Sequence, residues 1–141
     1  MGQPHLTVED SAEGDDIETV RRQLHAHNVA QTGVDDARPL TILLRDDTGQ
    51  VVGGLYGHTF WGWLAIELLW VHERLRGQGH GSGLVVKAEQ EAIARGCRQV
   101  LLDTMSFQAP DSYRRLGYEE FGVLEGFAGH HERHYLKKTL G

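Results

Sequence analysis

The chain is poor in cysteine and has no long apolar run. Cys97 is its only cysteine, so an internal disulfide is excluded and a reducing compartment is favoured. No apolar run approaches the roughly 20 residues that a membrane-spanning helix needs, so we expect no membrane partner. Residues 1–16 are polar and acidic, unlike a secretory signal or a basic transit peptide. We therefore expect a cytoplasmic protein.

Positive charge is also scarce. The 141 residues include 14 lysines and arginines against 20 acidic residues, which gives a net charge of −6. An acidic chain without a basic cluster is a poor candidate for binding nucleic acid, and it suits a cationic partner such as an amine better. Its length predicts one domain over residues 1–141.

Apolar periodicity and turn residues predict a mixed α/β fold with a mostly antiparallel sheet. The expected elements are a strand at His5–Glu9, a helix at Ile17–Gln31, strands at Leu40–Arg45, Gln50–His58 and Leu64–Val71, a helix from about Gly81 to Gly96, a strand at Gln99–Thr104, a short helix at Asp111–Leu116, and a strand pair at Tyr118–Leu124 and His134–Leu140. The strands flanking the second helix form a βαβ unit, so they should be parallel. Gly53 and Gly54 predict a bulge or a close approach by another group.

The segment Arg76–Gly81 is a glycine-rich turn between an apolar strand and a helix. Such a turn offers unpaired backbone N–H groups to an anion, and the helix dipole adds partial positive charge. The spacing excludes a P-loop, because no glycine–lysine pair follows. It also excludes the dinucleotide-binding spacing G-x-G-x-x-G, because the third position holds Ser82 or Leu84. We interpret the turn as a phosphate-binding loop of another type.

Two motifs carry a family resemblance. Arg76, Gly79 and Gly81 fit R-x-x-G-x-G, and Tyr113, Gly117 and Tyr118 fit Y-x-x-x-G-[FY]. Together they resemble the GNAT superfamily of N-acetyltransferases, in its small single-domain bacterial form. The resemblance implies a GNAT-like fold that binds acetyl-CoA as a co-substrate.

The reaction that this resemblance implies is transfer of acetyl to a primary amine of a small molecule or peptide, by direct attack in a ternary complex. It implies cofactor contacts along the strand end, the loop and a later segment: Leu69, Trp70, Val71, Arg76, Gly77, Gln78, Gly79, His80, Gly81, Ser106 and Gln108. The chain departs from the family pattern at Ser106, where many members carry asparagine, and at Ser112, where many carry an apolar residue.

Two residues are candidates for proton transfer. Tyr113 is expected to protonate the departing thiolate, since a phenol is a competent donor, although a core tyrosine would fit the same pattern. Glu67 lies in an apolar strand, where an unpaired charge is costly to bury, so it is either a paired structural carboxylate or the catalytic base. His58, His72 and a water relay remain open alternatives for the base.

Other conspicuous residues have simpler interpretations. The run His130–His134 does not place enough ligands on one strand face for a zinc site, so we expect no metal. Phe60, Trp61 and Trp63 are expected in the core or at a homodimer contact rather than at the acceptor. Cys97 is interpreted as a small core residue. A non-catalytic CoA-binding module and a protein-interaction domain are the alternative functions.

Overall fold

The computed structural model describes residues 2–11 and 14–141. It divides into two units, Met1–Asp35 and Asp36–Gly141, and each is described by itself. The prediction that residues 1–141 form a single domain stays a prediction.

The N-terminal unit contains helix α1 (Asp16–Thr32), close to its predicted bounds. The helix stops at Gly33, whose left-handed φ of 72° lets its N–H bond the carbonyl of Val29. The strand predicted at His5–Glu9 is wrong, because these residues form no strand and Leu6 and Val8 are fully exposed. Weak apolar alternation does not make a strand without a ladder partner and a face to bury.

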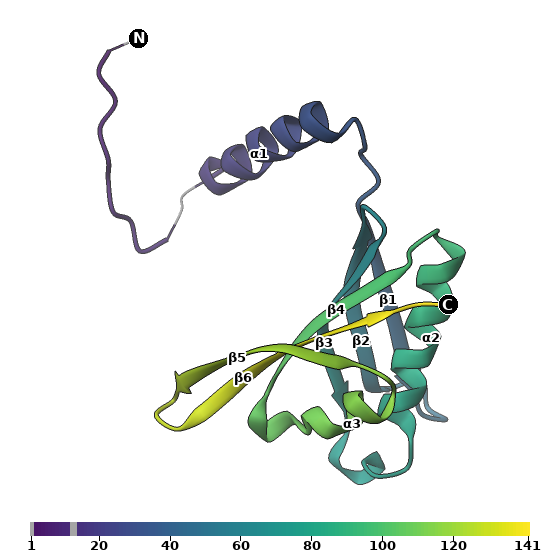
Figure 1. Cartoon of the computed structure of the whole chain (residues 1–141). Coiled ribbons are helices and arrows are strands. Elements are labelled where there is room, and N and C mark those ends of the chain that lie inside the picture. Colours follow the sequence, from purple (N-terminus) through teal and green to yellow (C-terminus); the bar gives the residue numbers. More distant parts are fainter. Residues whose placement is uncertain (1, 12–13) are drawn as a thin grey trace. The chain divides into compact units, whose positions relative to one another are not determined.

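A six-stranded sheet forms the second unit, in the order β1-β2-β3-β4-β6-β5 (Figure 1). Its strands are β1 (Arg38–Arg45), β2 (Val51–Phe60), β3 (Trp63–Val71), β4 (Gln99–Met105), β5 (Glu119–Phe127) and β6 (His131–Thr139). The β3–β4 pair is parallel and the other neighbouring strands of the sheet pair antiparallel, which confirms the predicted mixed, mostly antiparallel fold. Residues 2–11 and 14–141 contain no helix long and apolar enough to cross a membrane.

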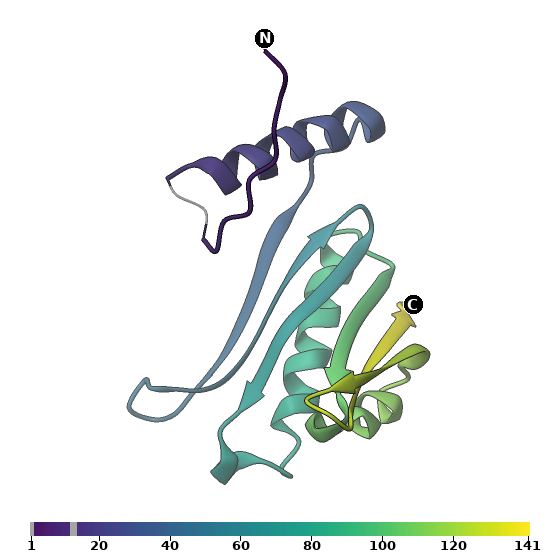
Figure 2. The same cartoon turned by 90° about the vertical axis from the view of Figure 1, so that its left-hand side faces the viewer.

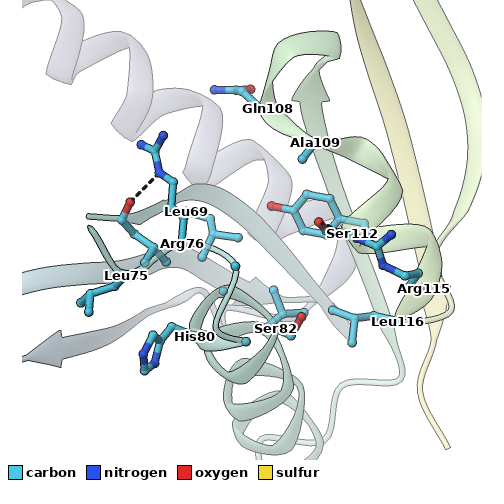
Figure 3. Close-up of a pocket in the computed structure, with 16 residues that line it drawn as sticks. Leu69, Leu75, Arg76, His80, Ser82, Gln108, Ala109, Ser112, Arg115 and Leu116 are labelled. Carbon is cyan, nitrogen blue, oxygen red and sulfur yellow. Dashed lines mark hydrogen bonds between the residues drawn. The ribbon is translucent and has the colours of Figure 1, made fainter. Parts of the chain in front are cut away.

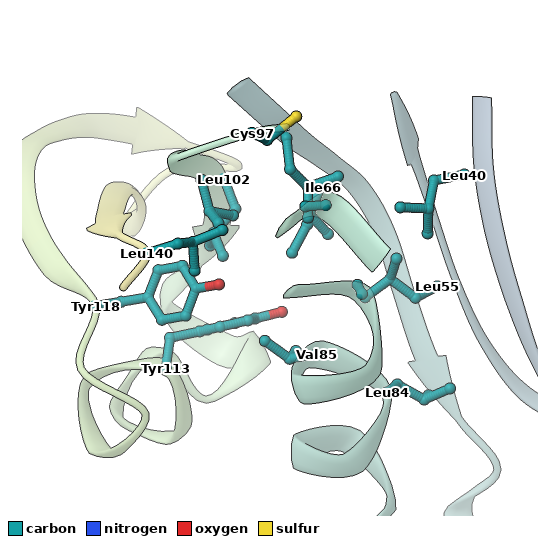
Figure 4. Packing of buried hydrophobic residues seen from close by; sticks show 14 of the residues in the cluster. Leu40, Leu55, Ile66, Leu84, Val85, Cys97, Leu102, Tyr113, Tyr118 and Leu140 are labelled. Atoms are coloured by element: carbon teal, nitrogen blue, oxygen red, sulfur yellow. The ribbon is translucent and has the colours of Figure 1, made fainter. Parts of the chain in front are cut away.

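Helix α2 (His80–Ala94) connects β3 to β4 and lies against one face of the sheet (Figure 2). It buries Leu84, Val85, Ala88 and Ala92 there, among strand residues that include the fully buried Leu64. The short helix α3 (Pro110–Arg115) brings Tyr113 into the same cluster, next to Tyr118 (Figure 4). Cys97 is also buried in this core, and burial raises the pKa of its thiol.

A β-bulge at Glu67 changes which way the end of β3 faces. Gly57 pairs with Ile66 and Tyr56 pairs with Leu68, so Glu67 is an extra residue on β3. Glycine is required opposite it, because a Cβ at Gly57 would lie 2.2 Å from the carbonyl oxygen of Ala65. The bulge shifts the alternation by one residue, so that Leu69 and Val71 pack towards the core while Leu68 and Trp70 are exposed.

A second irregularity lies beside the predicted bulge. The β1–β2 register shifts at Leu44 and Arg45, and Val52 is the residue left over on β2. Gly53 and Gly54 themselves are regularly paired. A Cβ at Gly53 would lie 3.1 Å from the carbonyl oxygen of Trp70, so the predicted close approach is present. Both irregularities therefore involve β2: the first places the extra residue Glu67 on β3, and the second places Val52 on β2.

Strands β3 and β4 separate directly after the bulge. Their parallel pairing runs from Trp63 with Gln99 to Ile66 with Leu102 and then ends. Beyond Ile66, β3 keeps its ladder with β2 only, so the backbone edge that faces β4 has no ladder partner there. The opening between these strands adjoins the glycine-rich loop.

Candidate active site

A cleft of about 430 Å³ lies where β3 ends and α2 begins, with α3 on its other side (Figure 3). Its lining includes most of the predicted cofactor residues: Leu69, Val71, Arg76, Gly77, Gly79, His80, Gly81 and Gln108. Tyr113 lines the same cleft. The fold thus brings together residues from two motifs that are more than 30 positions apart in the sequence.

The loop has the conformation of an anion-binding turn. After a short 3-10 helix, η1 (Glu73–Leu75), Gly77 and Gly79 take left-handed φ values of 76° and 87°, which side chains with a Cβ rarely adopt. The first α2 hydrogen bond runs from Gly83 N–H to the Gly79 carbonyl at 2.9 Å. The N–H groups of the three residues between them precede the helical ladder and are available to a ligand.

The loop is held to β3 by its own polar side chains. Arg76 Nε donates to the carbonyl oxygen of Val71 at 3.1 Å, drawn as the dashed line in Figure 3. Gln78 Nε2 donates to the carbonyl of Arg74 at 3.2 Å, and Gln78 does not line the cleft. Arg76 therefore fixes the strand end against the glycine turn, and Gln78 acts within the loop.

Besides Gln78, two predicted cofactor residues, Trp70 and Ser106, do not line the cleft. The side chain of Trp70 is 49% exposed on the opposite side of β3 from Leu69 and Val71, so only its backbone can contribute. Ser106 opens a 3-10 turn, η2 (Ser106–Gln108), where its Oγ accepts the N–H of Glu132 at 3.1 Å. Gln108 does line the cleft, and its Oε1 accepts the N–H of Met105 at 2.8 Å.

Tyr113 is both a core residue and a cleft residue. It is 8% exposed and packs edge-on against Tyr118, with ring centroids 5.8 Å apart. Burial raises the pKa of Tyr113 to about 12, so the phenol is protonated at neutral pH and can donate a proton or a hydrogen bond. The two interpretations of this residue from the sequence are therefore compatible.

Sequence reasoning missed several lining residues. Ser82 lies in the first turn of α2, while Ser112, Arg115 and Leu116 come from the segment around Tyr113. Arg115 is the most consequential of them, because it adds a guanidinium across the cleft from the loop. Its Nη2 lies 3.4 Å from the Oγ of Ser112. In a helix of six residues no periodic pattern identifies the inward face, so the sequence held little signal for these positions.

Glu67 is not buried, contrary to the premise of its prediction. Its side chain is 48% exposed on the face of the sheet opposite α2, and its Oε1 lies 3.2 Å from Nδ1 of His58. Glu67 is thus paired, with His58 as its partner, and its role as the catalytic base stays a prediction. Glu67 does not line the cleft, but it directly follows the last paired residue of β3, where the strands open.

The histidines near the C-terminus have other partners. His134 Nδ1 pairs with Glu120, and His131 packs edge-on against Phe107. Within the described ranges no group of three or more histidine, cysteine and acidic residues is arranged to hold a metal ion. Trp61 is 46% exposed in the β2–β3 turn, so the expectation that it lies in the core is wrong.

Comparison with known proteins gives the class of the protein. The model of the acetyltransferase (GNAT) family matches residues 6–118. The chain therefore belongs to this family, and it is an enzyme, an N-acetyltransferase acting on amino groups.

Three relatives support this membership, two of them over nearly the full chain. The chain is 38% identical to acetyltransferase Atu2258 of Agrobacterium fabrum, over 96% of the chain and 99% of the relative. It is 38% identical to the blasticidin-S acetyltransferase of Streptomyces morookaense, over 78% and 84%. A crystal structure from Agrobacterium tumefaciens, of a protein assigned as an acetyltransferase, superposes with a TM-score of 0.92 at 37% identity, over 97% of this chain and all of that one.

Proposed function

We propose that this enzyme transfers the acetyl group of acetyl-CoA to a primary amine, which attacks the thioester directly in a ternary complex. The observation that carries the proposal is the cleft in which the glycine-rich loop and Tyr113 face the opened end of β3. Family membership supports acetyl transfer. The ternary complex and the choice of a primary amine as the acceptor class are our own inference.

The chemistry of the cleft suits the co-substrate. A Cβ at Gly77 or Gly79 would meet no atom within 4 Å, so the space beside the N–H groups is open to a diphosphate. Arg76, His80 and Arg115 surround this space with cationic or protonatable side chains. The backbone edge at Leu69 and Val71 has no ladder partner on the β4 side, and apart from the Val71 carbonyl, which already accepts from Arg76, it can hydrogen-bond an amide-containing arm such as pantetheine.

The proposed reaction forms one bond and breaks one. The amine nitrogen attacks the thioester carbon, the C–N bond forms, and the C–S bond breaks. Tyr113 donates its phenolic proton to the departing sulfur and regains a proton from solvent. Cys97 is buried in the core and does not line the cleft, which supports direct attack over an acetyl-cysteine intermediate.

The acceptor must lose a proton before it attacks, because an alkylammonium has a pKa of about 10. We assign this step to Glu67 and its partner His58, on the face of the sheet opposite α2, because Glu67 lies where β3 and β4 separate. The relative that acetylates blasticidin S makes that compound a first acceptor to test. Polyamines, amino acids and peptide N-termini are the other acceptor classes to test.

Two measurements on the purified full chain test the proposal. Acetyl-CoA at about 100 times its Kd should stabilise the fold by roughly 2.7 kcal/mol, seen as a rise in Tm. A panel of blasticidin S, spermidine, lysine and a free-N-terminal peptide should include an amine that releases free thiol from acetyl-CoA, with the acetylated product seen by mass spectrometry. Binding without amine-dependent thiol release would favour a non-catalytic CoA-binding module. No rise in Tm would favour an interaction domain.

A further inference from the structure

Three side chains on the face of the sheet opposite α2 form a hydrogen-bonded series. The Tyr56 hydroxyl lies 3.3 Å from Nε2 of His58, and Nδ1 of His58 lies 3.2 Å from Oε1 of Glu67. The rings of Tyr56 and His58 meet edge to face at 5.2 Å. Both histidine nitrogens are therefore engaged, one by a hydroxyl and one by a carboxylate.

The backbone explains why these three residues meet. Tyr56 and His58 are two apart on β2, so they share a face of the sheet. His58 pairs with Ala65, and Glu67 follows two residues later on β3. Since the extra residue of the bulge is Glu67 itself, its side chain stays on this face while the strand beyond it is shifted.

The hydrogen bonds define the state of the imidazole. An ionised carboxylate only accepts hydrogen bonds, so Nδ1 of His58 must donate to Glu67. In the neutral ring Nε2 is then unprotonated and accepts from the Tyr56 hydroxyl. The basic nitrogen of His58 thus points at a group that can both give and receive a proton.

One end of the series, Glu67, lies at the opening between β3 and β4, while Tyr56 and His58 lie on β2, on the other side of β3. The last parallel pair is Ile66 with Leu102, and Glu67 is the next residue. The other groups facing His58 do not compete for its proton: on β1 its neighbours are Pro39 and Thr41, which do not titrate, and on β4 Asp103 is paired with Arg133.

We propose that Tyr56, His58 and Glu67 form a proton relay that deprotonates the acceptor amine; this rests on the proposed acetyl transfer. The ammonium N–H proton passes to the Tyr56 oxygen as the tyrosine's own proton passes to Nε2 of His58. The products are a neutral amine, a neutral Tyr56 and an imidazolium. Tyr56 and His58 are catalytic residues, while Glu67 is a positioning residue that orients the ring and stabilises its charge. An imidazole suits this task because its ordinary pKa, about 6.5, is close to neutral pH.

The pH dependence of kcat/KM at saturating acetyl-CoA tests the relay, with the amine found by thiol release as acceptor. His58→Gln should lower the value at pH 7 by about 100-fold or more and recover as the pH nears the amine's own pKa of about 10. Tyr56→Phe should lower it by about 10-fold or more, because the proton loses its path. Glu67→Gln should move the midpoint of the low-pH limb to lower pH, because the imidazolium loses its counter-charge.

A matched control is His25→Gln, which removes another histidine–carboxylate pair, with Asp35 at 3.1 Å, from an exposed site in the N-terminal unit. It should keep the wild-type profile. A His58→Gln enzyme within twofold of wild type at every pH would overturn the relay, as would an unmoved midpoint in Glu67→Gln. Calorimetry of acetyl-CoA binding to the wild type and to every variant separates the two proposals. A wild type that neither binds acetyl-CoA nor acetylates any amine refutes the proposed function itself, whereas a His58→Gln enzyme that binds acetyl-CoA and keeps its activity refutes only the relay.

A second readout does not depend on turnover. Long-range ¹H–¹⁵N spectra of the labelled wild-type chain, with His58 identified by the His58→Gln spectrum, should show this ring as the Nδ1–H tautomer at neutral pH. Observation of the Nε2–H tautomer would contradict the relay, because Nε2 could not then accept the proton of Tyr56.

Discussion

At the scale of single residues, Tyr113 shows how one side chain serves the core and the cleft together. Its ring is buried against Tyr118, which holds it in one position, and its edge reaches the cleft. Burial in apolar surroundings raises the pKa of Tyr113 to about 12 because the phenolate is poorly solvated there. A neutral phenol at a fixed position is what a proton donor to a thiolate requires.

Tyr113→Phe should separate chemistry from binding. The variant keeps the ring and its packing but loses the proton donor, so kcat should fall by about 100-fold or more while the Kd for acetyl-CoA stays within about threefold. Steady-state kinetics and calorimetry measure the two quantities. Tyr118→Phe is the matched control, because it removes a buried hydroxyl that does not line the cleft. It should lower Tm and leave kcat unchanged. An unaltered kcat in Tyr113→Phe would remove this residue from the acid role.

The role of the loop glycines in cofactor binding can be tested against a glycine elsewhere that has the same backbone conformation. Gly79 and Gly49 have φ values of 87° and 86°, and a Cβ at either would meet no atom within 4 Å. Valine at either site should therefore cost a similar conformational strain, roughly 1–2 kcal/mol. Only Gly79→Val should abolish acetyl-CoA binding in calorimetry, because its side chain enters the diphosphate space. Equal binding by both variants would contradict the loop assignment.

At the scale of elements, helix α2 links the loop to β6 and to the residue that precedes β5. Its residue Glu89 is 7% exposed and accepts a hydrogen bond from the hydroxyl of Tyr118 at 2.7 Å. Lys138 on β6 donates to both of its oxygens at 3.1 Å. These contacts satisfy a carboxylate that would otherwise be costly to bury, and they hold the helix that begins at the loop.

Lys138→Met should destabilise the fold by roughly 3 kcal/mol, because it leaves Glu89 without its counter-charge. Chemical denaturation measures the free energy of unfolding. Lys137→Met is the neighbouring control, since Lys137 is exposed, and its effect should stay within about 0.5 kcal/mol. Similar effects of the two substitutions would show that the Glu89–Lys138 pair does not hold α2.

At the scale of the whole molecule, two buried tyrosines connect stability to alkaline pH. Burial raises the pKa of Tyr113 to about 12, and burial together with Glu89 raises the pKa of Tyr118 further. An unfolded tyrosine ionises near pH 10. The folded state therefore holds protons that the unfolded state has released once the pH exceeds 10.

The free energy of unfolding should consequently be insensitive to these tyrosines below pH 10 and should fall as the pH rises from 10 towards 12. Guanidinium titrations at intervals between pH 8 and 11.5 measure it. Tyr118→Phe should show a shallower decline, since one of the two groups is gone. A wild-type stability that stays constant to pH 11.5 would contradict the buried, protonated state of both rings.

The oligomeric state of the protein also belongs to the scale of the whole molecule. Trp61 projects from the β2–β3 turn with 46% of its surface exposed, and the homodimer contact expected for the aromatic cluster stays a prediction. Light scattering coupled to size exclusion, with wild type and Trp61→Ser, tests it through the measured mass.

The sequence by itself determined the local features and the family. The glycine-rich turn and the start of α2 are properties of neighbouring residues, so periodicity and turn chemistry predicted them, and the two motifs at Arg76–Gly81 and Tyr113–Tyr118 carried the resemblance to the family. The strand at His5–Glu9 failed because a strand also needs a partner, and five residues of pattern do not supply one.

Only the tertiary structure decided where Glu67 points and which residues share the cleft. The bulge depends on the register between β2 and β3, which is set by the close contact at Gly57 rather than by the local pattern around Glu67. The opening of β3 from β4, the presence of Arg115 opposite the loop and the series from Tyr56 to Glu67 all join distant segments. Local pattern cannot encode such contacts, because cross-strand pairing and packing act between residues that the chain keeps far apart.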